Sequence, residues 1–464
     1  MIHDLQSVWA ALLEVEQSED LYRWRVGRVY LWPLLRDRLL REIAEQSGLI
    51  EKRVEPAKAS KQDLSWQQSW PNVPSLAAKT MVIPFLRRDA SGRDQFSQRF
   101  VEAFADSVSV MSVGHADLGK PTPQLEDIEA FIRGRYRNRA KVQVALSLRP
   151  WHNAKYARVM KSIESRIGKF GARYAKFPKW LLVDFVAQEL GYRDLFAAAG
   201  TERLIYVNAW RRGLIAGARA AGVKVIEPQH GAISKLHPLL SWPKSSSPAY
   251  LPDAFLAWGQ HWVDACGLPE NVATAIIGAP ERFAEVREQV QIGRLLRHPN
   301  RVVIASQVHQ TKTIAEFASR AAAENPELEI IFKPHPQEDP ELLATAFASA
   351  PKNLALLDAS EPLLPLMAGA SAVVGVYSTA LFEAAALGVP VGVLKLTGWQ
   401  HAEVLIERGD ALALTDSLPR NLLELTPSAE SAGYYFASAM PATEAGLSQL
   451  RQIVKEVTDT ENDR

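Results

Sequence analysis

The pattern of apolar and polar positions separates a helical start from two blocks in which strands and helices alternate. Over residues 1–50 the apolar residues recur at helical spacing, which predicts amphipathic helices. The candidate buried positions there are Trp24, Val29, Leu31, Leu34, Leu35 and Leu39. Residues 51–77 are polar and interrupted by prolines, so we expect a linker or an exposed excursion.

Short apolar runs followed by helical patterns begin at Thr80. The first block has such runs at 80–86, 107–113, 204–210, 223–228, 253–259 and 273–280, and its stretch 120–200 is mostly helical. A charged link near 281–300 leads to a second block from 301 to about 413. Strands that alternate with helices are typical of parallel sheets. We therefore predict an α/β chain with two Rossmann-like domains and an N-terminal helical extension.

Length, composition and charge narrow the class of protein. The chain has 464 residues, enough for about two or three domains. Its formal net charge of +1 gives no reason to expect a nucleic-acid partner, and its one cysteine, Cys266, excludes a disulfide framework or a cysteine-based zinc site. No signal peptide is recognisable, and no apolar run reaches the roughly 18–20 residues that span a bilayer. The expected compartment is the cytoplasm.

Two strand ends of the second block carry the most informative residues. The apolar run 328–332 ends in Lys-Pro-His-Pro at 333–336, and the run 372–376 ends in Tyr-Ser-Thr at 377–379. A helical pattern follows at once and stops at Gly388. An open α/β sheet binds ligands beyond the carboxyl ends of its strands, and a helix N-terminus favours a phosphate. The sequence therefore predicts a nucleotide phosphate at this edge.

Each of these residues also has a purely structural interpretation. Lys333 and His335 lie on one face of an extended segment, which favours an anion beside them, but His335 can also fill a turn between two rigid prolines. Ser378 and Thr379 can act as simple helix caps. Capping and phosphate binding are compatible, because a helix start leaves several N–H groups without partners. Glu383, one turn into the helix, can be an ordinary surface acid.

Three groups of residues resemble a known family in their order and spacing. They are Gln229-His230-Gly231 after a strand, the pair 257–259 and 277–280, and the pair 333–336 and 378–390. Together they are similar to bacterial surface-polysaccharide transferases of the GT-B fold. That group includes capsule Kdo transferases, polysialyltransferases and CDP-glycerol glycerophosphotransferases. The resemblance covers residues 200–400 well and 80–200 loosely, and residues 1–75 match nothing.

The resemblance implies a metal-independent glycosyltransferase with a nucleotide-activated, CMP-linked donor and a surface glycan or its lipid-linked primer as acceptor. The pattern along the chain and the resemblance together predict a helical extension and linker at 1–77, an acceptor domain at 78–290, a nucleotide-sugar domain at 298–440 and a C-terminal helix or tail at 441–464. The implied donor-binding residues are Lys333, His335, Tyr377, Ser378, Thr379 and Glu383, with Glu383 on the ribose. Among them His335 is also a catalytic candidate, because it would stabilise the leaving phosphate.

The resemblance assigns His230 as the base that deprotonates the acceptor, with His237 as a competing histidine. The loop after the first strand offers Asp89 and Asp94 as rival bases, since a carboxylate there can receive a hydroxyl proton. Arg87, Arg88 and Arg93 in that loop can hold an acidic acceptor or form a solvated surface. No Asp-x-Asp motif occurs, so we expect no cofactor and no required metal.

Three other functions stay open at this point. A glycerophosphotransferase would use the same site on CDP-glycerol. A non-hydrolysing sugar-nucleotide 2-epimerase would normally have a Gly-rich, doubly acidic segment where this chain has YSTALFE. A degenerate domain would serve as a scaffold in polysaccharide assembly. The N-terminal helices and the basic stretch 133–141 are candidate contacts with the inner face of a membrane, although charged helical faces are usually solvated.

Overall fold

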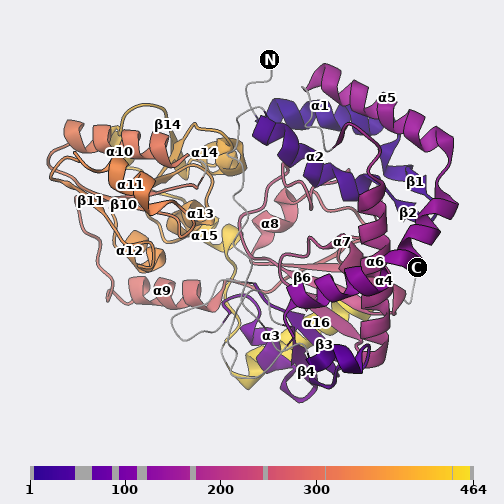
Figure 1. Ribbon diagram of the computed structural model, residues 1–464. Coiled ribbons are helices and arrows are strands. Elements are labelled where there is room, and N and C mark those ends of the chain that lie inside the picture. The colour runs from indigo at the N-terminus through magenta and orange to yellow at the C-terminus, as the bar shows by residue number, and fades with distance from the viewer. Residues whose placement is uncertain are drawn as a thin grey trace.

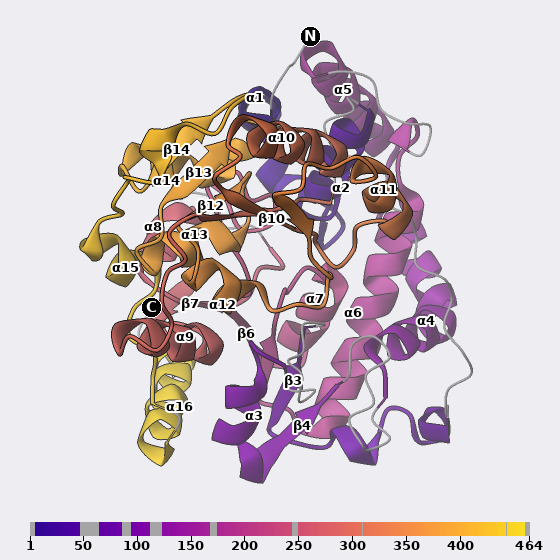
Figure 2. The same ribbon diagram turned by 90° about the vertical axis from the view of Figure 1, so that its left-hand side faces the viewer.

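The computed structural model describes residues 5–46, 65–85, 94–111, 123–167, 174–243, 249–308, 310–441 and 443–459. Over these residues the chain forms two six-stranded parallel sheets and a two-stranded antiparallel hairpin. Figure 1 shows the two sheets side by side with their helices, and Figure 2 shows the second sheet from the front. The predicted fold class, two Rossmann-like domains in the GT-B arrangement with N-terminal helices, is confirmed.

The first sheet has the strand order β4-β3-β5-β6-β7-β8. Its strands are β3 (Thr80–Ile83), β4 (Val108–Val110), β5 (Arg203–Tyr206), β6 (Lys224–Pro228), β7 (Ala254–Ala257) and β8 (Ala273–Ile276). The helical turns and helices of this part are α3 (Gln98–Ala103), η4 (Ala105–Ser107), α4 (Leu125–Ser147), α6 (Lys179–Ala199), α7 (Arg212–Ala220) and α8 (Gln260–Ala265). Strand β7, between β6 and the edge strand β8, is buried at every residue, as is typical of continuous apolar runs in parallel sheets.

The second sheet has the order β11-β10-β9-β12-β13-β14. Its strands are β9 (Arg301–Ala305), β10 (Glu329–Lys333), β11 (Leu354–Leu356), β12 (Ala372–Gly375), β13 (Val391–Leu394) and β14 (Ala411–Leu414). Its helices and turns are α10 (Thr311–Glu324), α11 (Pro340–Ala346), α12 (Leu363–Ala368), α13 (Thr379–Ala386), η6 (Trp399–Ala402), α14 (Glu403–Glu407) and η7 (Arg420–Leu422). This strand order is that of a doubly wound dinucleotide-binding sheet.

The N-terminal extension packs on the first domain. It consists of α1 (Leu5–Ser18), η1 (Leu21–Arg23), β1 (Arg25–Val26), β2 (Val29–Tyr30) and α2 (Trp32–Gln46), and α5 (Pro150–Arg166) lies beside α1 (Figure 1). The six candidate buried positions are confirmed, because none is more than 4% exposed. The extension is therefore part of the folded body.

The expected linker or exposed excursion at 51–77 is anchored by buried side chains in its described part, and residues 51–64 lie outside the described ranges. Residues 65–77 form η2 (Ser65–Ser69) and η3 (Pro74–Leu76), with Trp70, Val73 and Leu76 buried. Trp70 packs edge-on against Phe131 and its Nε1 donates a hydrogen bond of 3.2 Å to the Tyr136 hydroxyl. Apolar anchors spaced among polar residues gave no periodic signal in the sequence.

The chain passes between the two domains twice. Two glycines allow the backbone of the returning segment to approach closely. The first crossing leads into α9 (Glu281–Gln291), so part of the expected charged link is a helix. The second returns through α15 (Ala429–Tyr435) to α16 (Glu444–Asp459), which packs on the first sheet. Gly278 has φ +77°, and a Cβ there would lie 2.1 Å from the Ser438 carbonyl oxygen. A Cβ on Gly259 would lie 2.6 Å from the Tyr434 carbonyl oxygen. The segments 257–259 and 277–280 thus hold the crossover together.

Candidate functional site

The loop after β6 and the start of α13 meet between the two sheets. The backbone N–H of Ala232 donates a hydrogen bond of 2.8 Å to Oγ1 of Thr379. A Cβ placed on Gly231 would lie 3.6 Å from the same oxygen. Nearby, Oγ of Ser234 and Nδ1 of His401 are hydrogen-bonded at 2.7 Å. The structure therefore brings the predicted His-Gly loop and the predicted helix start together.

The second sheet changes direction between β9 and β12. The chain runs from β9 through β10 to β11 on one side, and then crosses to β12 on the other. Ligands of such sheets bind in the crevice between the segments that follow these two central strands. Here these segments contain Ser306 and Tyr377. Ser378 caps α13 as predicted, because its side chain accepts a 3.3 Å hydrogen bond from the Ala380 N–H. The remaining N–H groups of the first turn point the positive end of the helix at this crevice.

The turn after β10 is held by a buried carboxylate that the sequence did not single out. Glu338 is 8% exposed, and its Oε2 accepts a 2.6 Å hydrogen bond from the His335 N–H. Its Oε1 accepts from Oγ of Ser306 at 2.5 Å and from Oγ1 of Thr311. Glu338 thereby ties the Lys-Pro-His-Pro turn to the end of β9 and the start of α10.

The half-buried His335 ring has a defined orientation. Its Nδ1 accepts a 3.2 Å hydrogen bond from the Gln337 N–H. In the neutral ring the proton must then reside on Nε2, which is the nitrogen able to donate to an anion. The turn therefore presents a hydrogen-bond donor without requiring that the histidine be charged.

Lys333 makes different contacts from those its predicted role requires. Its ammonium group donates to the carbonyl oxygens of Ala359 at 2.7 Å, Asp358 at 3.1 Å and Pro334 at 3.3 Å. The residue is 4% exposed, and burial lowers its pKa. Lys333 thus joins β10 to the loop after β11, and its contact with a phosphate stays a prediction.

Glu383 is buried, so the alternative of an ordinary surface acid is wrong. It is 7% exposed, and its Oε1 lies 3.6 Å from Nη2 of Arg282 in α9. This ion pair links α13 to the helix that enters the second domain. The position one turn after Ser378 leaves the carboxylate near the same crevice, and the ribose contact stays a prediction.

Hydrogen bonds of the Gln229 side chain fix the loop that carries His230. The Gln229 side chain is 1% exposed, donates to the Gly231 carbonyl oxygen at 2.9 Å and accepts from the Trp258 N–H at 2.9 Å. The His230 ring lies 5.3 Å from the Phe85 ring, measured between centroids. Gln229 therefore shapes the turn, and His230 is carried at the carboxyl end of β6.

His237 is a structural residue of this loop. Its Nδ1 accepts hydrogen bonds from the N–H groups of Leu239 at 3.3 Å and Leu240 at 3.2 Å. Burial, followed by the charge of His230, lowers its pKa to about 3. A ring that uses its basic nitrogen in this way and resists protonation is a poor general base. His237 is therefore a weaker candidate for the base, and the role of His230 stays a prediction.

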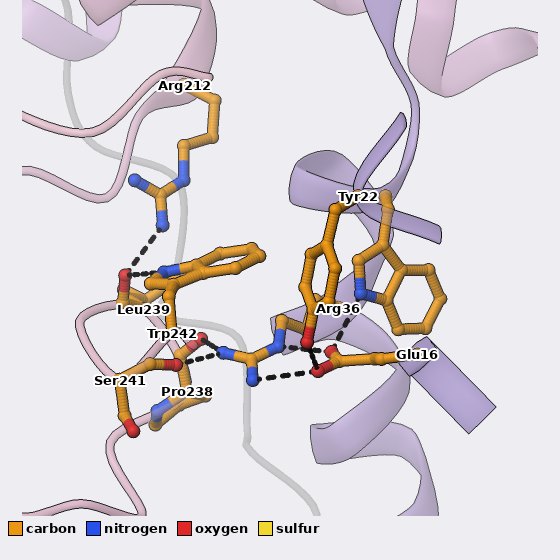
Figure 3. A network of polar contacts seen from close by, with 9 residues as sticks. Glu16, Tyr22, Arg36, Arg212, Pro238, Leu239, Ser241 and Trp242 are labelled. Atoms are coloured by element: carbon orange, nitrogen blue, oxygen red, sulfur yellow. Dashed lines mark hydrogen bonds and ion pairs between the residues drawn. The ribbon is translucent and has the colours of Figure 1, made fainter. Parts of the chain in front are cut away.

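The far end of the loop is anchored in the N-terminal extension, as Figure 3 shows. Nη1 of Arg36 donates to the carbonyl oxygens of Pro238 at 3.0 Å and Ser241 at 2.6 Å. Oε1 of Glu16 accepts from Arg36 Nε at 2.5 Å, and both side chains are almost completely buried. A buried ion pair with these further hydrogen bonds fixes the geometry of both segments.

The rival bases in the first domain divide into two groups. Asp94 is described, and its oxygens accept hydrogen bonds from the N–H groups of Phe85 and Phe96, both at 3.3 Å, and from the N–H and hydroxyl of Ser97. Burial raises its pKa, while these hydrogen bonds act in the opposite direction. Asp94 therefore holds its own loop together. Asp89, Arg87, Arg88 and Arg93 lie outside the described residues.

Three glutamines around the β9–β12 crevice were missed in the sequence. The buried Oε1 atoms of Gln307, Gln310 and Gln400 accept no hydrogen bond within the described structure. Nε2 of Gln310 donates to the Thr397 carbonyl oxygen at 2.7 Å, which fixes the direction of its Oε1. A buried acceptor without a donor costs about 1–3 kcal/mol. Donors from a ligand or from water are expected at these positions.

His401 was also missed, and it completes the polar surface between the domains. Burial lowers its pKa to about 4, so the ring is neutral near pH 7. Its ring lies 5.3 Å from that of Tyr377, and it contacts Ser234 across the two sheets. Glutamine and histidine in loops carry no sequence signal unless the fold brings them to one place.

Two general features complete the site. Among the described residues, no group of three or more His, Cys, Asp or Glu is arranged to hold a metal ion. No helix in the described part of the chain combines the length and apolar character that crossing a membrane requires.

The chain is distantly similar to several solved structures. No protein-family model and no curated protein matches the chain. The UDP-GlcNAc 2-epimerase of Methanocaldococcus jannaschii, solved with UDP-GlcNAc and UDP, aligns with 81% of this chain and 99% of its own, at 10% identity and a TM-score of 0.44. The glycosyltransferase SnogD of Streptomyces nogalater aligns with 82% of this chain and 98% of its own, at 12% identity and a TM-score of 0.44. The UDP-GlcNAc 2-epimerase of Neisseria meningitidis aligns with 82% of this chain and 98% of its own, at 12% identity and a TM-score of 0.43.

Proposed function

We propose that the protein is a glycosyltransferase that moves a sugar from a nucleotide-activated donor to a bacterial surface glycan or its lipid-linked primer, without a metal. The observation that carries the proposal is the meeting of two strand-end loops. The α13 start at Thr379 lies against the loop of His230, at a hydrogen-bond distance of 2.8 Å between Thr379 and Ala232. A donor on one sheet and an acceptor on the other can react only where two such loops meet.

The second domain supplies the donor half of the site. The N–H groups at the start of α13 and Nε2 of His335 stabilise negative charge on the departing phosphate, because they are fixed donors in a partly buried crevice. The buried Oε1 atoms of Gln310 and Gln400 accept hydrogen bonds from hydroxyl groups of the transferred sugar or ribose. Such oriented acceptors select a polyhydroxylated ligand. Glu383 adds a carboxylate for the ribose hydroxyls.

The first domain supplies the base. His230 removes the proton from an acceptor hydroxyl while that oxygen forms a bond to the anomeric carbon of the donor sugar. The bond from this carbon to the phosphate oxygen breaks, and the nucleotide leaves with the bonding electrons. The proton remains on His230 until solvent takes it. Closure of the two domains over the donor excludes water and so limits hydrolysis.

The donor nucleotide in this proposal is a cytidine nucleotide. The segments 229–231 and 333–336 most resemble transferases that use cytidine-activated sugars. Phosphate recognition by α13 and His335 does not distinguish bases, so base selection falls to the loops around the crevice.

The test is acceptor-dependent release of nucleotide from CMP-linked sugars, with the cell-envelope glycan fraction as acceptor. His230→Ala should lower turnover by about 10²–10⁴-fold, which is the contribution of a general base, and should leave nucleotide affinity unchanged. His237→Gln, a matched control on the same loop, should retain most turnover in its folded fraction. Wild-type turnover in His230→Ala would refute the assigned base. Inversion of a sugar carbon without nucleotide release would show an epimerase instead.

A further inference from the structure

An open hollow lies in the first domain, between α2, α4, α6 and the segment 210–213 that follows β5. The strand order β4-β3-β5 places the reversal of the first sheet between β3 and β5. Ligands of open α/β sheets bind beyond the carboxyl ends of the strands at such a reversal. The lining residues 210–213 follow β5, which is one of the two strands at this reversal.

Buried polar groups line this hollow. Glu129 and Gln188 are each 6% exposed, and Arg212 is 7% exposed. Nε of Arg212 donates to no acceptor in the described part of the chain. Burying such a donor without a partner costs about 1–3 kcal/mol. A hollow with these walls is built for a polar ligand.

The rim combines a flat aromatic ring with groups of both charges. Trp210 is 42% exposed, and the Arg211 guanidinium lies 4.6 Å from its ring centroid. Nε of Arg211 donates to Glu129 Oε1 at 3.0 Å, and Nε of Arg133 donates to Asp184 Oδ1 at 2.6 Å. Hydroxyl groups both donate and accept, so they match paired carboxylates and guanidinium groups. The C–H face of a sugar ring packs against an exposed indole. A carbohydrate fits this combination.

The walls of the hollow are connected to the His230 loop. Arg212 donates from Nη2 to the Leu239 carbonyl oxygen at 3.3 Å and from Nη1 to the Tyr250 carbonyl oxygen at 2.8 Å. On α2, Arg36 holds the same loop through Pro238 and Ser241 (Figure 3). The next residue, Asp37, lines the hollow. These hydrogen bonds connect the walls of the hollow to the loop that carries the proposed base.

We propose that this hollow is an acceptor subsite that takes one sugar unit of the acceptor glycan, and that α2 of the N-terminal extension forms one of its walls. The inference rests on the proposed transferase function and adds the place and class of its second substrate. It also gives the N-terminal extension a role, because α2 both lines the subsite and fixes the loop of His230.

The test is binding of oligosaccharides released by mild acid from the surface polysaccharide of the source cells, followed by calorimetry on the full-length protein. Wild type should bind them saturably, and Trp210→Ala should weaken binding at least tenfold. Trp151→Ala is the matched control, because Trp151 is 53% exposed on α5 and does not line the hollow. This control should bind like wild type.

The outcomes separate the subsite from the proposed function, because nucleotide binding is measured in the same samples. If wild type binds nucleotide but not the oligosaccharides, or if Trp210→Ala binds them as tightly as wild type, the subsite proposal is overturned and the transferase proposal stands. If wild type binds no nucleotide, the transferase proposal fails as well. Circular dichroism of Trp210→Ala confirms that the variant is folded.

Discussion

Oγ1 of Thr379, the first residue of α13, accepts a hydrogen bond of 2.8 Å from the backbone N–H of Ala232, in the loop after β6. The two residues come from different sheets and lie far apart in the sequence. The contact puts the helix end proposed to stabilise the leaving phosphate beside the loop proposed to carry the base. Because this hydrogen bond joins the two domains, a substitution of Thr379 can test whether it holds the loop in place.

Thr379→Val should loosen this contact, because valine has the shape of threonine but accepts no hydrogen bond. The Ala232 N–H then lacks its partner, and we expect faster amide hydrogen exchange in peptides that cover residues 229–236. Thr379→Ser keeps the oxygen and should exchange like wild type. Equal exchange in the valine and serine variants would show that the contact does not hold the loop.

His335→Ala should lower turnover by about 10²–10³-fold, since one fixed donor to a developing anion is worth about 2.7–4 kcal/mol in the transition state. The melting temperature without ligand should change little, because the bond that holds the turn uses the His335 backbone N–H. Steady-state kinetics and thermal unfolding check the two halves separately. Near-normal turnover would make His335 a structural residue.

Glu338→Ala, unlike His335→Ala, should lower the stability of the fold. Its removal leaves the His335 N–H and the hydroxyls of Ser306 and Thr311 without their acceptor. Each buried group that loses its partner costs about 1–3 kcal/mol, so we expect a loss of at least about 2 kcal/mol in urea unfolding. Glu341→Ala, an exposed acid nearby, should stay within about 0.5 kcal/mol of wild type. Equal stabilities would refute the role of Glu338.

Glu383→Ala should weaken nucleotide binding by at least tenfold, since a hydrogen bond to a charged group contributes about 1.5–3 kcal/mol. Arg282→Ala tests whether the ion pair of 3.6 Å is responsible instead, because it removes the pair and keeps the carboxylate. We expect its affinity to stay within about twofold of wild type. Equal affinities of Glu383→Ala and wild type would remove this residue from the ribose site.

Stability should fall in acid partly because of His261, which is buried beside Phe382 and Tyr435. Burial lowers its pKa from 6.5 to about 4. Between these two values the unfolded chain binds more protons than the folded one, so stability is present above pH 6.5 and is lost as pH falls toward 4. The loss attributable to His261 is about 2 kcal/mol at pH 5.

His261→Phe should therefore make the fall in melting temperature between pH 6.5 and 4 shallower. His237 and His401, whose pKa values are also lowered, act in the same direction in both proteins. Burial raises the pKa of Glu227 to about 7, which opposes them as pH falls from 7 to 4.5. Only the difference between the variant and wild type isolates His261. Parallel curves would contradict its assigned pKa.

Local patterns in the sequence predicted the strands and the start of α13 because each depends on neighbouring residues. The apolar runs became β10 and β12, and Ser378 became the cap of the helix that Gly388 terminates with φ +71°. The surroundings of Lys333 were not predictable, because its partners at Asp358 and Ala359 come from another strand end.

The crevice itself could not be read from the sequence for a related reason. Gln310 and Gln400 follow different strands, β9 and β13, and become one site only when the sheet places those strands on either side of β12. The glycines at 259 and 278 were recognised through a resemblance, while their physical reason is the chain returning at 434–438. Such close approaches depend on tertiary contacts that no local pattern encodes.

Calorimetric titration with CMP, CDP, UDP, GDP and ADP tests the central claim most directly, because the β9–β12 crevice must bind a nucleotide if the protein is this transferase. We predict that CMP or CDP binds most tightly to wild type and that Glu383→Ala weakens that binding. Binding of UDP or GDP at least tenfold tighter than both cytidine nucleotides, about 1.4 kcal/mol, would contradict the cytidine assignment. Absence of binding by all five nucleotides would contradict the account as a whole.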